Sequence, residues 1–219
     1  MSSIEAGVSL RISEIFYSLQ GETSRVGLPT VFIRLTGCPL RCHYCDTSYA
    51  FTGGKGMTLE AIVAEVQSYP TKYVTVTGGE PLAQKQCHTL MRVLCELGYH
   101  VSLETSGALD VSAVDKRVMK ILDIKTPASG EVEKNLWSNL SAMNPDDEIK
   151  FVVCDEADYV WAKSTLVEKR LTDKCEVLFS PAQGQLSPTD LADWVLRDRL
   201  NVRMQVQLHK ILWGNVSGR

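Results

Sequence analysis

Short apolar and β-branched segments recur along the chain, and longer segments with helical patterning lie between several of them. Segments of a few residues that are bounded by turn-forming residues predict β-strands. They lie at residues 30–36, 73–77, 100–105, 117–125, 148–154, 175–180 and 202–208. Because most of them are apolar throughout, we expect strands that are buried on both faces of a largely parallel sheet.

Four segments have the pattern of helices, at residues 59–69, 82–97, 155–171 and 189–198. Thr58 and Ser187 are suitable N-caps, and Pro188 suits a first helical turn. Gly98 suits the left-handed position that follows a helix. The alternation of strands and helices predicts one α/β domain over residues 1–219, built as an open sheet or as a complete or partial β/α barrel.

The composition narrows the class of protein. A chain of 219 residues with 44% hydrophobic and 22% charged residues fits a single soluble globular domain. No segment has the apolar length of a membrane span, and the N-terminus lacks a signal-peptide pattern, so we expect a cytoplasmic protein. A formal net charge of −3 without a basic stripe argues against direct nucleic-acid binding and favours a small ligand or a protein partner.

The unusual residues of the chain follow the predicted strands. Ligands of α/β sheets and barrels bind beyond the carboxyl ends of the strands. The segments just past those ends are a cysteine cluster, "GGEP" at 78–81, "TSG" at 105–107, "TP" at 126–127, "SPAQ" at 180–183, and His209 with Lys210. We therefore expect these residues on one rim of the sheet.

Three of the seven cysteines, Cys38, Cys42 and Cys45, have the spacing C-x3-C-x2-C. A structural zinc site needs a fourth ligand, and His43 lies inside the loop at an awkward position for that role. A dithiol redox pair at Cys42 and Cys45 would leave the third thiol without a purpose. Three thiolates on an iron–sulfur cube leave one iron open to a substrate or cofactor.

This spacing resembles that of the radical S-adenosylmethionine (SAM) superfamily, and further motifs narrow the resemblance. They are "EIFYSLQGE" (14–22), "VFIRLTGC" (31–38), "CDTSYAF" (45–51), "VTGGEP" (76–81), "LETSG" (103–107) and "QLHK" (207–210). Together they resemble the 7-carboxy-7-deazaguanine synthase family over nearly the whole chain. The resemblance implies an incomplete β/α barrel of the radical SAM type, usually homodimeric. It also implies conversion of 6-carboxy-5,6,7,8-tetrahydropterin to 7-carboxy-7-deazaguanine with loss of ammonia, a lyase reaction of queuosine biosynthesis.

The same resemblance implies cofactors and site residues. A [4Fe-4S] cluster would be held by Cys38, Cys42 and Cys45, with SAM on its open iron, a flavodoxin or ferredoxin as electron donor, and Mg²⁺ at Thr47. SAM would contact Tyr44, Cys45, Asp46, Gly79, Glu80, Asp123, Ile124, Lys125, Ser180, Pro181, Ala182 and Gln183. The pterin would contact Leu19, Gln20, Gly21, Arg34 and Thr77.

The chemistry of several of these side chains agrees with such roles. Glu80 offers an acceptor for an ammonium group, and Gln20 offers both donor and acceptor groups to a ring edge. A buried, unpaired Arg34 would cost roughly several kcal/mol, so it needs an anion, either the substrate carboxylate or a structural Asp or Glu. Thr47 is a poor sole ligand, and Mg²⁺ would take most of its oxygens from substrate and water. No proton-transfer residue is assigned; the candidates are Glu22, Glu104 and His209.

Two departures from the family pattern and two alternatives remain at this stage. Thr23 stands where the family usually has glycine, and it would be strained if its φ were positive. Whether Arg219 comes near the site is open. A radical SAM activase that acts on a glycine of a partner enzyme shares the cysteine spacing but lacks "CDT" and "LQGE". A zinc-stabilised binding module is the non-enzymatic alternative.

Overall fold

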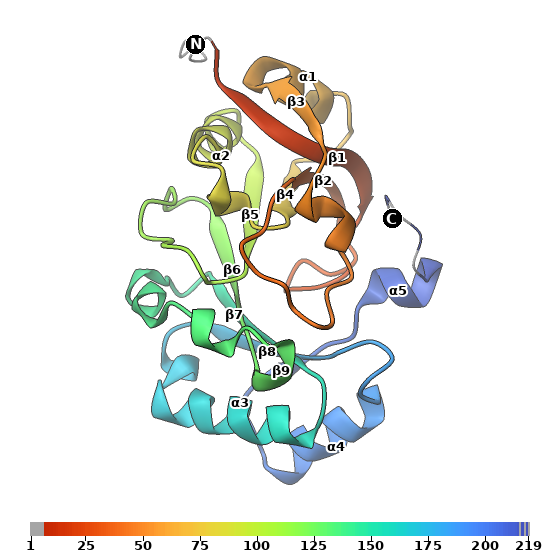
Figure 1. The fold of residues 1–219 in the computed structure, drawn as a ribbon, viewed down its shortest axis with the longest axis vertical. Helices are drawn as coiled ribbons and strands as arrows, with labels where there is room; N and C mark the ends of the chain where they lie inside the picture. The colour runs from red at the N-terminus through yellow and green to blue at the C-terminus, as the bar shows by residue number, and fades with distance from the viewer. Residues whose placement is uncertain (1–6, 215, 217, 219) are drawn as a thin grey trace.

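The computed structural model describes residues 7–214, 216 and 218, which contain one open, nine-stranded sheet in the order β3-β1-β2-β4-β5-β6-β7-β8-β9 (Figure 1). β1 (Ser9–Leu19) pairs antiparallel with both β2 (Pro29–Leu35) and β3 (Lys55–Thr58). The other neighbours are parallel: β4 (Tyr73–Gly78), β5 (His100–Thr105), β6 (Met119–Ile124), β7 (Glu148–Val153), β8 (Glu176–Pro181) and β9 (Arg203–Met204). The largely parallel sheet agrees with the sequence pattern.

The helices are α1 (Leu59–Gln67), α2 (Cys87–Glu96), α3 (Glu156–Glu168), α4 (Pro188–Arg197) and α5 (Leu208–Trp213). Short 3₁₀ turns complete the connections: η1 (Ser48–Phe51), η2 (Pro81–Ala83), η3 (Pro127–Ser129), η4 (Val132–Lys134), η5 (Trp137–Ala142) and η6 (Leu171–Asp173). The expected caps are present, since Thr58 accepts from Ala61 N, Ser187 accepts from Thr189 N, and Gly98 has φ +80°. Within the described ranges, no helix is long and apolar enough to cross a membrane.

The two faces of the sheet differ in polarity because side chains alternate along each strand. Apolar residues such as Ile33, Val76 and Phe151 belong to the core beneath the helices. The intervening positions carry polar groups, and strand register aligns them: Arg34 is opposite Thr77 on β4, while Asp123 of β6 is opposite Lys150 of β7. The face away from the core therefore carries charged and hydroxyl side chains among apolar ones such as Phe32 and Ile121.

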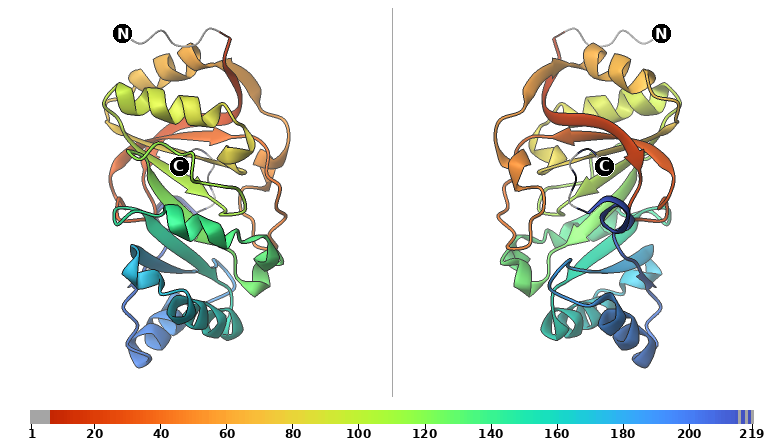
Figure 2. Two further views of the ribbon diagram at one scale, coloured as in Figure 1. Left: turned by 90° about the vertical axis from the view of Figure 1, so that its left-hand side faces the viewer. Right: turned by 90° about the vertical axis from the view of Figure 1, so that its right-hand side faces the viewer.

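The structure adds two strands and corrects two of the predicted elements. β1 and β3 were not predicted; β1 carries charged and half-exposed positions instead of a continuous apolar run. The strand predicted at 202–208 is wrong beyond Met204, because the chain leaves the sheet and begins α5 at Leu208 (Figure 2). There Leu208 N donates to the Gly21 carbonyl at 2.9 Å. The helix predicted at 82–97 is divided into η2 and α2.

Candidate active site

A cavity of about 620 Å³ lies at the carboxyl ends of the parallel strands. Nineteen of the residues proposed from the sequence line it: Leu19, Gln20, Gly21, Glu22, Arg34, Cys38, Cys42, Tyr44, Cys45, Asp46, Thr47, Thr77, Gly79, Glu104, Asp123, Lys125, Ala182, Gln183 and His209. Four others, Glu80, Ile124, Ser180 and Pro181, are buried and do not line it. The predicted convergence on one rim is therefore correct.

The three cysteines of the motif are free, half-buried thiols that face this cavity. Their loop is fastened from outside, where His43 N donates to the Ser129 carbonyl at 3.0 Å and the His43 Nδ1 lies 3.2 Å from the Ala128 carbonyl. His43 does not line the cavity and is not placed as a fourth ligand. Among the described residues, no three His, Cys, Asp or Glu side chains are arranged around one metal ion. Three sulfurs around a shared space suit a larger cluster better than a structural zinc ion.

The "GGE" segment after β4 is joined to the cysteine loop through the backbone. Gly79 N donates to the Leu35 carbonyl at 3.1 Å, and Glu80 N donates to the Gly37 carbonyl at 2.7 Å. A Cβ on Gly79 would lie 2.2 Å from the Gly37 oxygen and 3.0 Å from the Cys38 Cβ. Only glycine permits this approach, so the motif fixes the position of the cysteine loop.

The carboxylate of Glu80 is fully buried beneath the cavity. It accepts from Leu82 N at 3.1 Å, from Thr105 Oγ1 at 2.9 Å and from Ser106 N at 2.7 Å. Ser106 Oγ also donates to it, and both Thr105 and Ser106 line the cavity. In this structure Glu80 therefore holds the "TSG" segment in place, and its contact with the SAM ammonium group remains a prediction.

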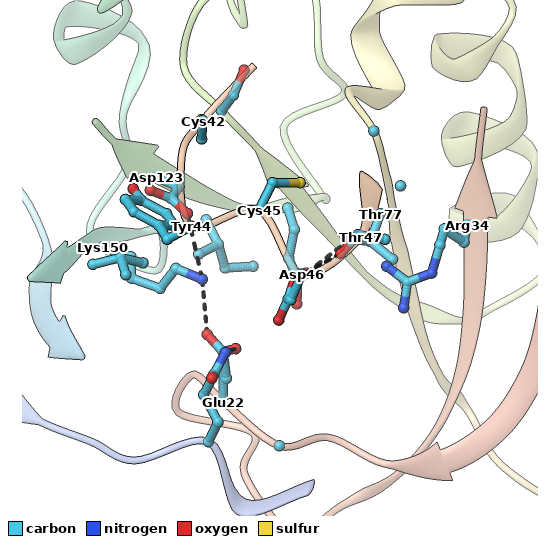
Figure 3. Close-up of a pocket in the computed structure, with 18 of the residues that line it drawn as sticks. Glu22, Arg34, Cys42, Tyr44, Cys45, Asp46, Thr47, Thr77, Asp123 and Lys150 are labelled. Carbon is cyan, nitrogen blue, oxygen red and sulfur yellow. Dashed lines mark hydrogen bonds and ion pairs between the residues drawn. The ribbon is translucent and has the colours of Figure 1, made fainter. Parts of the chain in front are cut away.

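A network of ion pairs lines the cavity, and its central lysine, Lys150, is the member that sequence reasoning missed (Figure 3). Lys150 Nζ lies 2.8 Å from Glu22 Oε2 and 3.5 Å from Asp123 Oδ2, and Lys125 Nζ lies 3.0 Å from Asp123 Oδ1. Gln207 Nε2 donates to the other Glu22 oxygen at 2.7 Å. The signal that drew attention to Arg34, one cation in an apolar strand, was also present for Lys150 in "EIKFVV".

The ion pairs shift the pKa values of Lys150 and Glu22 against the effect of burial. Burial alone would lower the pKa of Lys150, but Glu22, Asp123 and Glu104 outweigh it and the pKa is raised. Burial would likewise raise the pKa of Glu22, yet Lys150 and Gln207 lower it on balance. Lys150 is therefore a permanent cation beside an ionised Glu22.

A second polar group lies on β4 and β5. Thr77 Oγ1 donates to Glu104 Oε2 at 2.9 Å, and the buried Gln20 donates through Nε2 to Thr75 Oγ1 at 3.2 Å. Burial, followed by the charge of Glu22, raises the pKa of Glu104. The cavity thus holds one carboxyl group whose pKa is raised, Glu104, beside one whose pKa is lowered, Glu22.

Arg34 has the structural partner that the sequence left open. Its Nε donates to Glu14 Oε1 at 2.7 Å. The guanidinium also lies over the rings of Phe16 and Tyr49. Its two Nη groups have no hydrogen-bond partner in the part of the chain that the structure describes, and the side chain lines the cavity. Arg34 can therefore bind a further anion.

Residues 207–210, here called the C-terminal strap, cross the cavity from the segment after β1 to the cysteine loop. The ring of His209 packs on Gly21, where a Cβ would lie within 2 Å of Nδ1, and burial lowers the pKa of His209. Lys210 Nζ pairs with Asp46 Oδ2 at 2.5 Å. The last residue, Arg219, lies outside the described residues.

Thr23 adopts the strained conformation expected if it replaced a left-handed glycine. Its φ is +70°, and the residue is 2% exposed. The backbone is held by a hydrogen bond from Thr23 N to Gln205 Oε1 at 2.8 Å. The surrounding contacts therefore impose a backbone conformation that a β-branched residue rarely adopts.

Comparison with known proteins now decides the family. The model of the radical SAM superfamily matches residues 32–126. The 7-carboxy-7-deazaguanine synthase of Chlorobaculum tepidum is 50% identical over 207 residues, which cover 93% of this chain and 94% of that relative. The chain belongs to the 7-carboxy-7-deazaguanine synthase family. A second synthase, from Koribacter versatilis, is 44% identical, and the matched region covers 93% of this chain and 97% of that relative.

A solved structure supports the fold of this synthase family. The crystal structure of QueE from Escherichia coli superposes with a TM-score of 0.78 and 24% identity, and it covers 95% of this chain and 100% of that chain. Family membership confirms the radical SAM partial barrel and the synthase activity expected from the motifs. The activase and the zinc-module alternatives are set aside.

A 7-carboxy-7-deazaguanine synthase uses a [4Fe-4S] cluster and SAM, as its superfamily implies. The residues of this cavity fit both groups. Three free thiols face the same space, which is the donor set of a cluster with one iron left open. The buried hydroxyl of Tyr44 has no hydrogen-bond partner among the described residues, which leaves it available to a ligand.

Proposed function

We propose that the cavity binds SAM and a carboxylated pterin side by side, and that it converts 6-carboxy-5,6,7,8-tetrahydropterin to 7-carboxy-7-deazaguanine with release of ammonia. The observation that carries this proposal is the convergence of the three cysteines with Gln20, Arg34 and Thr77 on one cavity. Its volume of about 620 Å³ lies within the range of ordinary small-molecule sites.

The SAM half is assigned to the cysteine loop, the "GGE" segment and the rim of β6 and β8. When bound at the open iron, SAM supplies the 5′-deoxyadenosyl radical that removes a hydrogen atom from the substrate. The chain contributes Tyr44, Asp46, Gly79, Asp123 and Lys125 as cavity walls. Ala182 and Gln183 close the same side. Glu80 orients Ser106 toward this half from below.

The pterin half is assigned to β2, β4, β5 and residues 19–21. Gln20, Thr77 and Glu104 offer donors and acceptors that complement the polar edge of a pterin ring. The free Nη groups of Arg34 suit the substrate carboxylate, which can form a charge-assisted pair with them. The apolar ring of Phe32 lines the same side.

We place Mg²⁺ beside Thr47. The hydroxyl of Thr47 donates to Asp46 Oδ1 at 2.8 Å, while Asp46 is also paired with Lys210. One neutral hydroxyl is a weak site alone, so the substrate and water must supply most of the oxygen ligands. Mg²⁺ binding is therefore expected to depend on the substrate.

Release of ammonia requires a proton, and the three candidate residues differ in protonation. Of the three, Glu104 is the carboxyl group whose pKa burial raises, so it is the proposed proton donor. Glu22 stays ionised beside Lys150. Burial lowers the pKa of His209, which is therefore a neutral hydrogen-bonding group.

From the family resemblance we also infer a homodimer in the cytoplasm that is reduced by a flavodoxin or ferredoxin.

The test is anaerobic turnover of the reconstituted protein with SAM, a reductant, Mg²⁺ and the carboxypterin. Mass detection should show 7-carboxy-7-deazaguanine and an equal amount of ammonia. Cleavage of SAM while the pterin remains unchanged would contradict the substrate assignment. Replacement of Cys38, Cys42 and Cys45 together by Ala should remove the visible absorbance of the cluster, and persistence of that absorbance would contradict the ligand assignment.

A further inference from the structure

Lys150 has a position that no motif explains. It comes from the buried strand β7, its side chain is 12% exposed, and it lies opposite Asp123 in the strand register. Figure 3 shows its ammonium group reaching between Asp123 and Glu22, with dashed contacts to both. One cation therefore joins two carboxylates across the cavity.

The two carboxylates belong to different halves of the site. Asp123 stands on β6, is also paired with Lys125, and shares its side of the cavity with the ring of Tyr44. Glu22 directly follows the segment at 19–21 and is held on its other oxygen by Gln207. The SAM half and the pterin half are thus connected through a single ammonium group.

The charge balance makes this connection strong. Glu22, Asp123 and Glu104 are three carboxyl groups around Lys150, and only Asp123 has another lysine within ion-pair distance in the described residues. If Lys150 lost its charge, Glu22 would be a buried anion with no cationic partner at ion-pair distance, and it would be repelled by Asp123. Such a pair would relax by moving the carboxylates apart or toward solvent.

We propose that Lys150 is a positioning residue that sets the separation of the two halves, by holding Asp123 on the SAM side and Glu22 on the pterin side. This inference rests on the proposed function, which places SAM and the pterin in those halves. Hydrogen transfer between two bound molecules requires close alignment, and a displacement of about 1 Å can cost roughly 100-fold in rate. Lys150 acts through the two carboxylates and is not assigned a contact with either ligand.

The experiment compares Lys150→Met with a matched control, Lys120→Met. Lys120 is also a buried strand lysine, with a side chain 3% exposed and an ion pair to Asp147 at 2.8 Å, but it does not line the cavity. Lys150→Met loses the ion pairs to Glu22 and Asp123, and Lys120→Met loses the ion pair to Asp147, so both should lower the melting temperature. Lys150→Gln keeps a hydrogen-bonding group without the charge and replaces Lys150→Met if the latter does not fold.

Two readouts separate positioning from stability. The first is the dissociation constant of SAM and of the carboxypterin, each measured by anaerobic equilibrium dialysis on cluster-loaded, unreduced protein. The second is the ratio of 5′-deoxyadenosine to 7-carboxy-7-deazaguanine after reduction. We expect Lys150→Met to weaken both ligands and to raise the ratio, each by about 10-fold. Lys120→Met should leave all three values unchanged.

The outcomes are distinct. If Lys150→Met keeps both affinities and the product ratio of the wild type, or weakens only one ligand, Lys150 does not connect the two halves. If both lysine variants change the readouts equally, the effect comes from general destabilisation and the proposal is overturned. If the wild type itself cleaves SAM but gives no product, the proposed function fails, and the inference fails with it.

Discussion

The two walls of the cavity are built differently. The cysteine-side wall, residues 35–46 and 78–80, is fixed by backbone hydrogen bonds and by a glycine approach that admits no side chain. The other wall, residues 19–23 with the C-terminal strap, is called the substrate-side wall after the proposed function. Leu208 N donates to the Gly21 carbonyl and His209 packs closely on Gly21, but the wall is fixed mainly by side chains from distant parts of the chain. Glu22 meets Lys150 across 128 positions and Gln207 across 185 positions. Local backbone contacts therefore fix the first wall, whereas the second wall depends on partners distant in the sequence, although its residues also stand in the motifs "EIFYSLQGE" and "QLHK".

The largest expected effect tests the rigidity of the cysteine-side wall. Gly79→Ala would place a methyl group 2.2 Å from the Gly37 oxygen, and neither backbone can move without displacing Cys38. We expect a loss of about 3 kcal/mol in the free energy of unfolding, because such an overlap cannot relax through a rotamer change. Denaturant unfolding, together with the visible absorbance of the reconstituted cluster, measures the effect.

Gly56→Ala is the matched control for this substitution. Gly56 lies on β3, and an added Cβ would have no atom within 4 Å. Its effect should stay within about 1 kcal/mol, in the direction of stabilisation, because alanine restricts the unfolded chain. Equal effects of the two substitutions would show that the close approach at Gly79 is not what fixes the cysteine loop.

The sequence predicted the parallel part of the fold well, for a physical reason. β5 lies at its predicted position, 100–105, and β4 and β7 end within one residue of prediction, because each is a short segment rich in β-branched and apolar residues between turn-forming residues. β1 was missed because it belongs to the antiparallel part of the sheet, where most of its residues are only partly buried and polar residues interrupt the apolar pattern. The strand predicted at 202–208 failed beyond Met204 because the strap follows a contact with Gly21 that no local pattern encodes.

The same distinction applies to the site. The cysteines, Gly79 and Thr77, which line the cavity, could be named from the sequence because each stands in a short motif at or after the end of a strand. Their roles stay predictions. Lys150 was missed because its role depends on partners that the chain brings together only on folding. The sequence predicted that Arg34 needs an anionic partner, but it did not identify Glu14. Glu14 lies on β1, and the antiparallel pairing of β1 with β2 brings it to Arg34.

An intermediate effect tests the substrate-side wall through pH. Burial lowers the pKa of His209, with Glu22 and Asp46 opposing that shift and Lys210 adding to it. Below the ordinary histidine pKa of 6.5, the unfolded chain therefore binds more protons than the folded protein. The contribution of His209 to stability is thus fully present above 6.5 and declines as the pH falls from there toward the lower folded pKa.

His209→Asn removes this titration while keeping a polar side chain. The difference in the free energy of unfolding between wild type and His209→Asn should be constant above about pH 7.5 and should fall toward about pH 5. Chemical denaturation across that range measures the difference. A difference that is flat over the whole range would mean that His209 titrates alike in both states, and that the strap does not bury it.

The smallest expected effect concerns the strain at Thr23, which lies on the substrate-side wall. Thr23→Gly would relieve a left-handed backbone worth about 1–2 kcal/mol. It would also lose a buried methyl group and the 3.2 Å hydrogen bond that Arg25 N donates to Thr23 Oγ1. In addition, glycine would raise the conformational entropy of the unfolded chain. Because these losses offset the relief of strain, the net change should stay within about 1 kcal/mol of zero, as measured by denaturant unfolding.

Arg199→Gly separates the two contributions, because Arg199 also has a positive φ, +51°, but is exposed on the surface. Its substitution reports the relief of backbone strain without the loss of buried contacts. If Thr23→Gly is destabilising while Arg199→Gly is stabilising, the contacts of the Thr23 side chain outweigh its strain. The substrate-side wall would then owe its shape to side-chain packing even at the one position where its backbone is strained, which sharpens its contrast with the backbone-fixed cysteine loop.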